Sequence, residues 1–210
     1  NYLIRTGRRA EHAALVEQYF KAQNMFRNDD GGQVEYTKTI KFDLNRVEQT
    51  LAGPKRPQDV FAFSSARETF NSTLKNKKGL QGFGLSKEDL TAKVNVDLNG
   101  KEITLTHGSI LIAAITSCTN TSDPSVMIAA ALLANNAAAK GLSCKPWVKT
   151  SFAPGSRVVN TYLRNAGLAG GLDKLGFNIV GYGCTTCIGN SGPIHPSLSK
   201  AVRENDLVAA

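Results

Sequence analysis

Residues 110–124 read Ile110-Leu-Ile-Ala-Ala-Ile-Thr-Ser-Cys-Thr-Asn-Thr-Ser-Asp-Pro124, and the architecture of the chain can be inferred from them. The first six residues form a continuous apolar run, which is typical of a strand buried on both faces. Ser122 or Asp123 is a suitable helix cap, and Pro124 is favourable in the first turn of a helix. The segment therefore predicts a buried strand, a short loop that carries Cys118, and a helix.

The same order of strand, loop and helix recurs in the rest of the chain. Further strands are expected at Trp147 to Thr150 and at Phe177 to Gly181, and further helices at residues 156–165 and 196–205. This alternation predicts an α/β fold with a mostly parallel sheet and helices on both faces. Cys118 and Cys184 each follow a predicted strand, so we expect both at the carboxyl edge of the sheet, where such folds bind ligands.

The residues before this region predict a helix, a strand and a hairpin. A helix is expected at residues 9–27, because apolar residues recur there at helical spacing. Apolar and polar side chains alternate from Val34 to Leu44, which predicts a strand. Residues 93–97 and 101–105 flank an Asn-Gly pair, which favours a tight turn between two strands.

Gly53-Pro-Lys-Arg-Pro57 is a rigid, turn-prone connector and our predicted domain boundary. Residues 1–57 would then be an N-terminal flank, made of the end of a preceding domain and a connector. Residues 58–210 would be the α/β domain. We expect that domain to be truncated at its C-terminus, because Leu207-Val-Ala-Ala210 resembles the start of a strand. The chain is thus interpreted as an excised segment of a larger protein.

Composition limits the classes of protein to which the chain can belong. Hydrophobic residues make up 41% and charged residues 20% of its 210 residues, which excludes an intrinsically disordered chain. The longest apolar run, Val126 to Ala134, is far shorter than the roughly 20 residues of a membrane helix. Four cysteines are too few for a disulfide scaffold, so we expect a reducing, cytoplasmic location. The net charge of +8 suits an anionic ligand or nucleic acid, although the basic residues are scattered.

Three of the cysteines lie in two loops rich in small polar residues. They are Cys118 and the pair Cys184 and Cys187. Three thiolates are one ligand short of closing a four-iron cluster, so one iron would be open to a substrate oxygen as a Lewis acid. This pattern predicts dehydration chemistry. A Cys-x-x-Cys motif also serves zinc sites and thiol–disulfide exchange, and a zinc site would take its fourth ligand from Cys144 or His195.

Four other residues are candidates for contacts with a cluster or a ligand. Asn120 and Asn190 carry amides that can donate hydrogen bonds to cluster sulfides or ligand oxygens. Ser156 and Arg157 begin a predicted helix, whose free backbone amides and positive dipole end could bind an anion. The alternative for Ser156 is a simple helix cap.

These motifs resemble the aconitase family, specifically the large aconitases that include the cytosolic iron-regulatory proteins and the bacterial citrate-cycle enzymes. The resemblance runs through nearly the whole chain and rests on Ala113–Ser122, Lys149–Ser151, Ala153–Ser156, Gly181–Pro193 and Gly53–Asp59.

The resemblance implies a hydro-lyase of the tricarboxylic acid cycle. Cys118, Cys184 and Cys187 would be the ligands of a [4Fe-4S] cluster, whose fourth iron chelates a carboxylate and the hydroxyl of citrate or isocitrate. Water would be removed and added again through cis-aconitate. The acid–base residues of the family have no counterpart here, so the segment alone is expected to be inactive. Two alternatives stay open: 2-methylcitrate dehydration, and RNA binding by the protein without its cluster.

Overall fold

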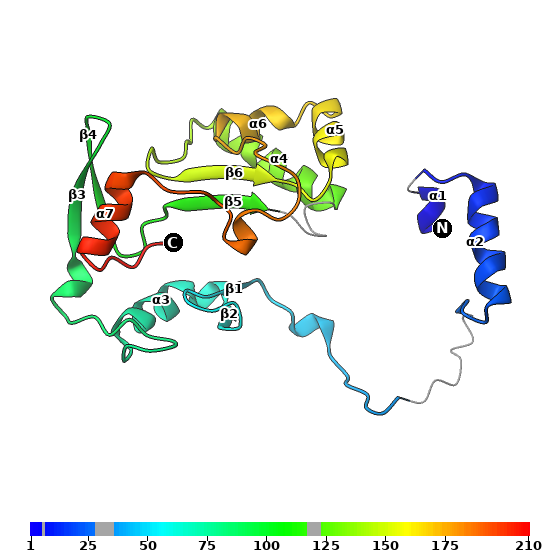
Figure 1. Cartoon of the computed structure of the whole chain (residues 1–210), viewed down its shortest axis with the longest axis horizontal. Helices are drawn as coiled ribbons and strands as arrows, with labels where there is room; N and C mark the ends of the chain where they lie inside the picture. The colour runs from blue at the N-terminus through cyan, green and yellow to red at the C-terminus, as the bar shows by residue number, and fades with distance from the viewer. Residues whose placement is uncertain (6, 28–35, 117–122) are drawn as a thin grey trace. The chain divides into compact units, whose positions relative to one another are not determined.

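The computed structural model describes residues 1–5, 7–27, 36–116 and 123–210 (Figure 1). The chain divides into two compact units, residues 1–47 and residues 48–210. In the part of the chain that the structure describes, no helix is long and apolar enough to cross a membrane.

The first unit holds helices α1 (Tyr2–Arg5) and α2 (Ala10–Ala22) and the 3-10 turn η1 (Leu44–Arg46). The predicted helix is confirmed as α2, but it ends at Ala22 and not at Arg27. Asn24 follows in the left-handed conformation, with φ of 56°, which a helix cannot continue through. The predicted strand from Val34 to Leu44 is wrong for its described residues, because 36–43 contain no strand. Strands need a hydrogen-bonded neighbour, and none of the described residues pairs with this segment.

The second unit contains three pairs of strands and five α-helices among its described residues. The strands are β1 (Thr50–Ala52), β2 (Val60–Ala62), β3 (Lys93–Leu98), β4 (Lys101–Thr106), β5 (Ile112–Thr116) and β6 (Lys149–Ala153). The helices are α3 (Ala66–Lys75), α4 (Pro124–Ala139), α5 (Arg157–Asn165), α6 (Ala169–Lys174) and α7 (Pro196–Glu204). Helices α4, α5 and α7 confirm the predictions from capping and periodicity. Helices α3 and α6 and strands β1 and β2 were missed.

The parallel arrangement is confirmed for one pair of strands. β5 pairs in parallel with β6, while β1 with β2 and β3 with β4 are antiparallel hairpins. The predicted strand at Phe177–Gly181 is only an isolated parallel bridge between Ile179 and Phe152. The fold is therefore a mixture of helices and small sheets, and the mostly parallel sheet is not confirmed. Each residue of β5 is half-buried, not fully buried as expected.

The predicted hairpin is confirmed as β3 and β4. Asn99 and Gly100 form its turn with φ angles of 55° and 81°, which few residues other than Asn and Gly adopt. The Asp97 carboxylate accepts a hydrogen bond of 2.6 Å from the Gly100 amide, which stabilises the turn.

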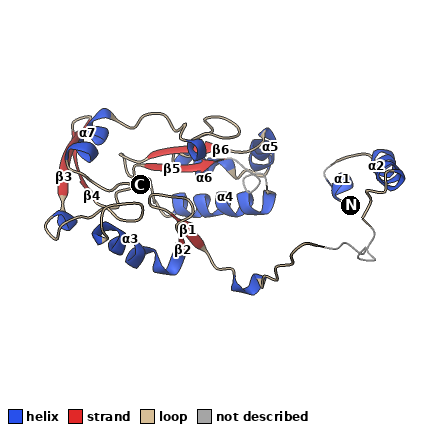
Figure 2. Ribbon diagram, turned by 60° about the horizontal axis from the view of Figure 1, so that its bottom comes forward, coloured by secondary structure: helices blue, strands red, loops and turns tan. Residues whose placement is uncertain are grey.

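Two hydrophobic clusters hold the second unit together. In the first, helices α4, α5 and α6 pack against β6 through Met127, Ala131, Ala134, Phe152, Val159, Leu163 and Leu172. Figure 2 shows α4 lying alongside β5 and β6. In the second, the β3–β4 hairpin packs against α7 through Val96, Leu98, Ile103, Leu105, Leu111, Leu198, Ala201 and Leu207, and Trp147 packs against it.

The last residues of the chain lie beside the segment that leads into β5. The Gly108 amide donates to the Val208 carbonyl at 2.8 Å, and the Ala210 amide donates to the Ser109 carbonyl at 3.0 Å. Leu111 then donates to the Ala210 carbonyl at 2.6 Å. These bonds satisfy backbone groups of the segment that leads into the strand that carries the candidate site.

Candidate functional site

The candidate site lies at the edge where β5 and β6 both end. Because the two strands are parallel, Thr116 and Ala153, their last residues, lie at the same edge. The Gly183 amide donates a hydrogen bond of 2.9 Å to the carbonyl of Pro154, the residue after β6. This bond places the start of the Cys184–Cys187 loop next to the end of β6.

The cysteine loop is folded back on itself. It contains the 3-10 turn η5 (Thr186–Ile188), and the Thr185 carbonyl accepts hydrogen bonds from Ile188 at 3.1 Å and Asn190 at 3.0 Å. Gly189 closes the turn with φ of 81°, a conformation in which other residues are strained. Cys184 and Cys187 are both exposed. The loop thus presents two thiols from a tight turn.

Thr116 connects this loop to the end of β5. Its hydroxyl oxygen lies 3.8 Å from the Cys187 sulfur and 3.2 Å from the Thr185 hydroxyl oxygen. Cys118 is two residues further along the chain than Thr116. Cys118 and Asn120 themselves lie outside the described residues. The strand end that leads to Cys118 is therefore in contact with Cys187.

Sequence reasoning missed Thr116 and Thr185. Both residues stand within the two cysteine motifs, where a short hydroxyl side chain close to each cysteine was the available signal. What the sequence could not show is that these two hydroxyls, 69 positions apart, meet each other.

The start of α5 also lies against the cysteine loop. The Ser156 hydroxyl accepts a hydrogen bond of 3.3 Å from the Val158 amide, so Ser156 caps the helix. The Arg157 guanidinium lies 5.7 Å from the centre of the Tyr182 ring, within the range of a cation–π contact. Tyr182 is two residues before Cys184, so this contact brings a positive charge close to the loop. Asn190 is exposed at the other end of the loop.

The segment after the cysteine loop leads to the opposite end of β6. Lys149, the first residue of β6, donates from its amine to the Pro193 carbonyl at 3.0 Å. His195 then caps α7, with its Nδ1 accepting from the Ser197 amide at 3.3 Å. Cys144 is exposed and precedes β6 in the chain. Cys144 and His195 are thus both associated with the start of β6, whereas the Cys184 loop begins at its end.

A half-buried tyrosine in α5, Tyr162, has a perturbed pKa. The Tyr162 hydroxyl is buried and makes no hydrogen bond to the described residues. Its pKa is raised above 10.0, first by burial and second by the negative charge of Asp123. Asp123 caps α4, and hydrogen bonds from Ser125 lower the pKa of its carboxyl group.

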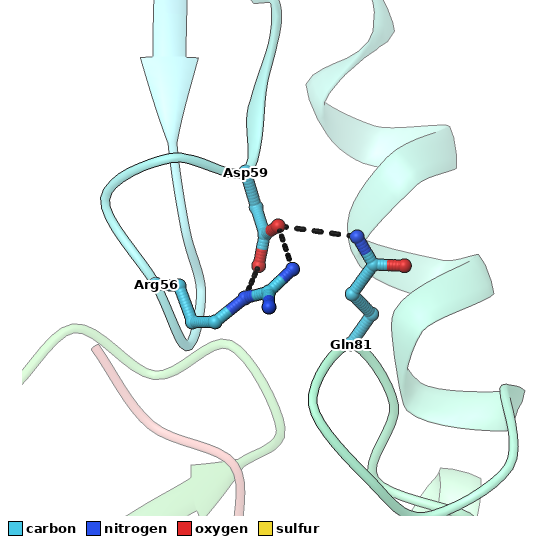
Figure 3. Close-up of polar contacts among 3 residues, drawn as sticks. All are labelled: Arg56, Asp59 and Gln81. Carbon is cyan, nitrogen blue, oxygen red and sulfur yellow. Dashed lines mark hydrogen bonds and ion pairs between the residues drawn. The ribbon is translucent and has the colours of Figure 1, made fainter.

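The predicted connector at Gly53–Pro57 is fixed by polar contacts (Figure 3). Arg56 makes two hydrogen bonds to the Asp59 carboxylate, at 2.6 and 2.9 Å, and Gln81 makes a third at 3.1 Å. These bonds lower the pKa of Asp59, with Arg56 as the largest cause. The Lys55 amine donates to the carbonyls of Gly79 and Gly82, both at 2.7 Å. The connector and residues 79–82 therefore form one ordered structure.

The cysteine loop is chemically suited to an iron–sulfur cluster. Its two thiols are exposed, soft ligands, and a hydroxyl donor lies within reach of one of them. A Cβ atom added at Gly183 or Gly189 would meet no atom within 4 Å, so the space directly beside the loop is open at these two positions. The described residues, from which Cys118 is missing, contain no group of three metal-binding side chains.

Comparison with known proteins gives a consistent result. A family model described as "Aconitase family (aconitate hydratase)" matches residues 1–209. The chain is 53% identical over 211 residues to aconitate hydratase A of Thermus thermophilus and 52% identical over 209 residues to that of Deinococcus radiodurans. It is 49% identical over 209 residues to aconitate hydratase A of Bacillus subtilis. These alignments cover 99–100% of the chain but only 23% of each relative.

Proposed function

Because this chain belongs to the aconitase family, we propose that it is the cluster-binding portion of an aconitate hydratase. The whole enzyme would isomerise citrate and isocitrate through cis-aconitate by removing and adding water. The proposal concerns the longer protein, since the chain spans about a quarter of the length of the relatives it matches.

The observation that carries the proposal is the contact between Thr116 and Cys187. It joins the end of the strand that precedes Cys118 to the turn that holds the other two cysteines, with 3.8 Å between the hydroxyl oxygen and the sulfur. Two residues of extended chain reach about 7 Å. Cys118 can therefore reach the neighbourhood of Cys184 and Cys187, as a shared cluster requires.

Cys118, Cys184 and Cys187 would hold a [4Fe-4S] cluster through their thiolates. When bound, the cluster supplies a Lewis acid through the iron that lacks a protein ligand. Arg157, held near the loop by Tyr182, would attract the carboxylates of a tricarboxylate substrate. Asn120 and Asn190 would orient substrate oxygens or cluster sulfides by donating amide hydrogen bonds. Ser156 caps α5 and thereby fixes the position of Arg157.

The names of the relatives favour aconitate hydration over 2-methylcitrate dehydration. Tricarboxylates are the substrates that this activity implies, and a net charge of +8 suits such anions. We also propose that the whole enzyme acts in the tricarboxylic acid cycle and that it is located in the cytoplasm.

Two parts of the architecture are proposals as well. A domain boundary at Pro57 is supported by the Gly-Pro-rich connector, although the compact units divide after Val47. A larger, mostly parallel sheet with helices on both faces is supported by the β5–β6 pair and by residues 208–210, which hydrogen-bond beside the entry to β5.

Anaerobic reconstitution with iron and sulfide tests the cluster site. The wild-type protein should develop the absorption and electron paramagnetic resonance spectra of a cluster, and Cys118→Ser, Cys184→Ser and Cys187→Ser should each lose most of them. Cys144→Ser is the matched control, because Cys144 is exposed and associated with the other end of β6. A cluster that survives in Cys118→Ser but disappears in Cys144→Ser would contradict the assignment.

An activity measurement on the isolated segment tests whether the acid–base residues lie outside it. The reconstituted 210-residue chain should show no conversion of isocitrate, because the acid–base residues of the family lie elsewhere. Appreciable turnover by this chain would show that the proposed division is wrong.

A further inference from the structure

We propose that Thr116 is a positioning residue that holds the Cys187 sulfur through a two-hydroxyl relay with Thr185. The inference rests on the proposed function, since it assigns Cys187 to a cluster. Its structural part, the link between β5 and the cysteine turn, can be tested without any cluster.

The direction of the relay follows from the chemistry of a hydroxyl group. The Thr116 hydroxyl donates to the Cys187 sulfur at 3.8 Å. The same hydroxyl oxygen lies 3.2 Å from the Thr185 hydroxyl oxygen. A hydroxyl has one proton to donate and two lone pairs that accept. If the Thr116 proton points to the sulfur, the proton between the two threonines must come from Thr185. The relay therefore runs from Thr185 through Thr116 to Cys187.

The relay fixes the cysteine turn at two points. Thr116 is the last residue of a paired strand, so its backbone is held by the β5–β6 ladder. Thr185 is the residue whose carbonyl accepts from both Ile188 and Asn190 and thereby closes the turn around Cys187. One hydroxyl thus links the rigid strand to both the turn and its sulfur. A hydrophobic residue of the same shape would keep the packing but lose both bonds.

The hydrogen bond to sulfur would be stronger when Cys187 is a thiolate ligand. Hydrogen bonds to an ionised acceptor are roughly twice as strong as neutral ones. Such bonds to cluster ligands also favour the reduced, more negative state, which raises the reduction potential. Thr116 would therefore affect both the order of the turn and the electronic state of the cluster.

Hydrogen exchange of the protein without cluster tests the positioning role. In Thr116→Val, the amides of Ile188 and Asn190 should exchange severalfold faster than in the wild type, because the turn loses its link to β5. Thr116→Ser keeps the hydroxyl and should restore slow exchange. The control is Thr104→Val, which removes an exposed hydroxyl in β4 that bonds Asn95 at 2.9 Å. Unchanged exchange at both amides in Thr116→Val would overturn the proposal.

A redox titration of the reconstituted protein tests the effect on the cluster. At a fixed potential, the ratio of reduced to oxidised cluster should fall about tenfold in Thr116→Val, which corresponds to about 59 mV for one electron. Thr116→Ser and Thr104→Val should titrate as the wild type does. An unchanged reduction potential in Thr116→Val would overturn the proposed effect of Thr116 on the cluster. Failure of the wild type to assemble any cluster would reject the proposed function, while the exchange experiment would still decide the structural link.

Discussion

Gly171 packs directly against the backbone of Asn135. A Cβ atom at Gly171 would lie 2.4 Å from the Asn135 nitrogen and 2.7 Å from its Cα, which is closer than real atoms approach. The side-chain amide of Asn135 also donates from Nδ2 to the Leu168 carbonyl at 3.1 Å, which ties α4 to the start of α6. The two helices therefore meet through backbone, at a point where only glycine fits.

Gly171→Ala should lower the free energy of unfolding by about 1–3 kcal/mol, because the methyl group forces α4 and α6 apart. The adjacent Gly170→Ala is the control, since its Cβ would meet no atom within 4 Å. It should be neutral or stabilise by up to about 1 kcal/mol through helix propensity. Urea unfolding followed by circular dichroism measures both. Equal effects of the two substitutions would show that α4 and α6 are not in backbone contact.

His107 should be important for stability, because it joins two distant segments. Its Nδ1 accepts from the Val208 amide at 3.0 Å, and its Nε2 lies 2.9 Å from the Asp89 carbonyl. With Nδ1 accepting from Val208, the Nε2 atom is the ring nitrogen that donates to the Asp89 carbonyl.

His107→Ala should cost about 1–3 kcal/mol, because it leaves the Val208 amide without its partner. Unfolding can be followed by the fluorescence of Trp147, the single tryptophan, which packs against this core. His12→Ala on exposed α2 should change stability by less than about 0.5 kcal/mol. If both variants unfold at the same urea concentration as the wild type, the bridge contributes nothing.

Asp59 should make the free energy of unfolding depend on pH in the acid range. Its pKa is lowered below the ordinary 3.8 by Arg56 and Gln81. A carboxyl group whose pKa is lower in the folded protein than in the unfolded chain stabilises the fold at pH values above the unfolded-chain pKa. This stabilisation is lost as the pH falls through the folded-state pKa. Wild-type stability should therefore decline below about pH 4 more steeply than that of Asp59→Asn. Asp173→Asn in α6 serves as the control, and parallel curves for Asp59→Asn and the wild type would contradict the prediction.

Tyr162→Phe should leave stability unchanged or raise it by up to about 1 kcal/mol at neutral pH, because it removes a buried hydroxyl without a partner among the described residues. Because the pKa of Tyr162 is raised in the folded protein, its contribution to stability is complete below pH 10.0 and is lost as the pH rises through the folded-state pKa. The phenylalanine variant should therefore lose less stability above pH 10. A clear loss of stability at neutral pH would instead reveal a hydrogen-bond partner for the hydroxyl.

Local signals predicted much of the second unit. The Asn-Gly turn at residues 99 and 100 and the caps Asp123 and Ser156 all act within a few residues, so the sequence contains the information for them. The alternation from Val34 to Leu44 was misleading, because a strand also needs a partner and periodicity does not show whether one exists. The strand predicted at Phe177–Gly181 was too long for the same reason, because only Ile179 has a bridge partner.

The sequence indicates candidate ligands for the site, which stay a prediction, but it does not show what surrounds them. The cysteine motifs are recognisable from residue types and spacing alone. The meeting of Thr116 with Cys187 depends on two segments 71 positions apart, and no local pattern encodes it. The contact of Arg157 with Tyr182 is of the same kind.

The bonds between residues 107–111 and 208–210 also set an order of events during synthesis. About a hundred residues separate the Val208 amide from His107. A ribosome adding about 5–20 residues per second would leave the segment before β5 without these partners for several seconds after it emerges. This segment can therefore take its final hydrogen-bonded form only after residues 208–210 have been synthesised.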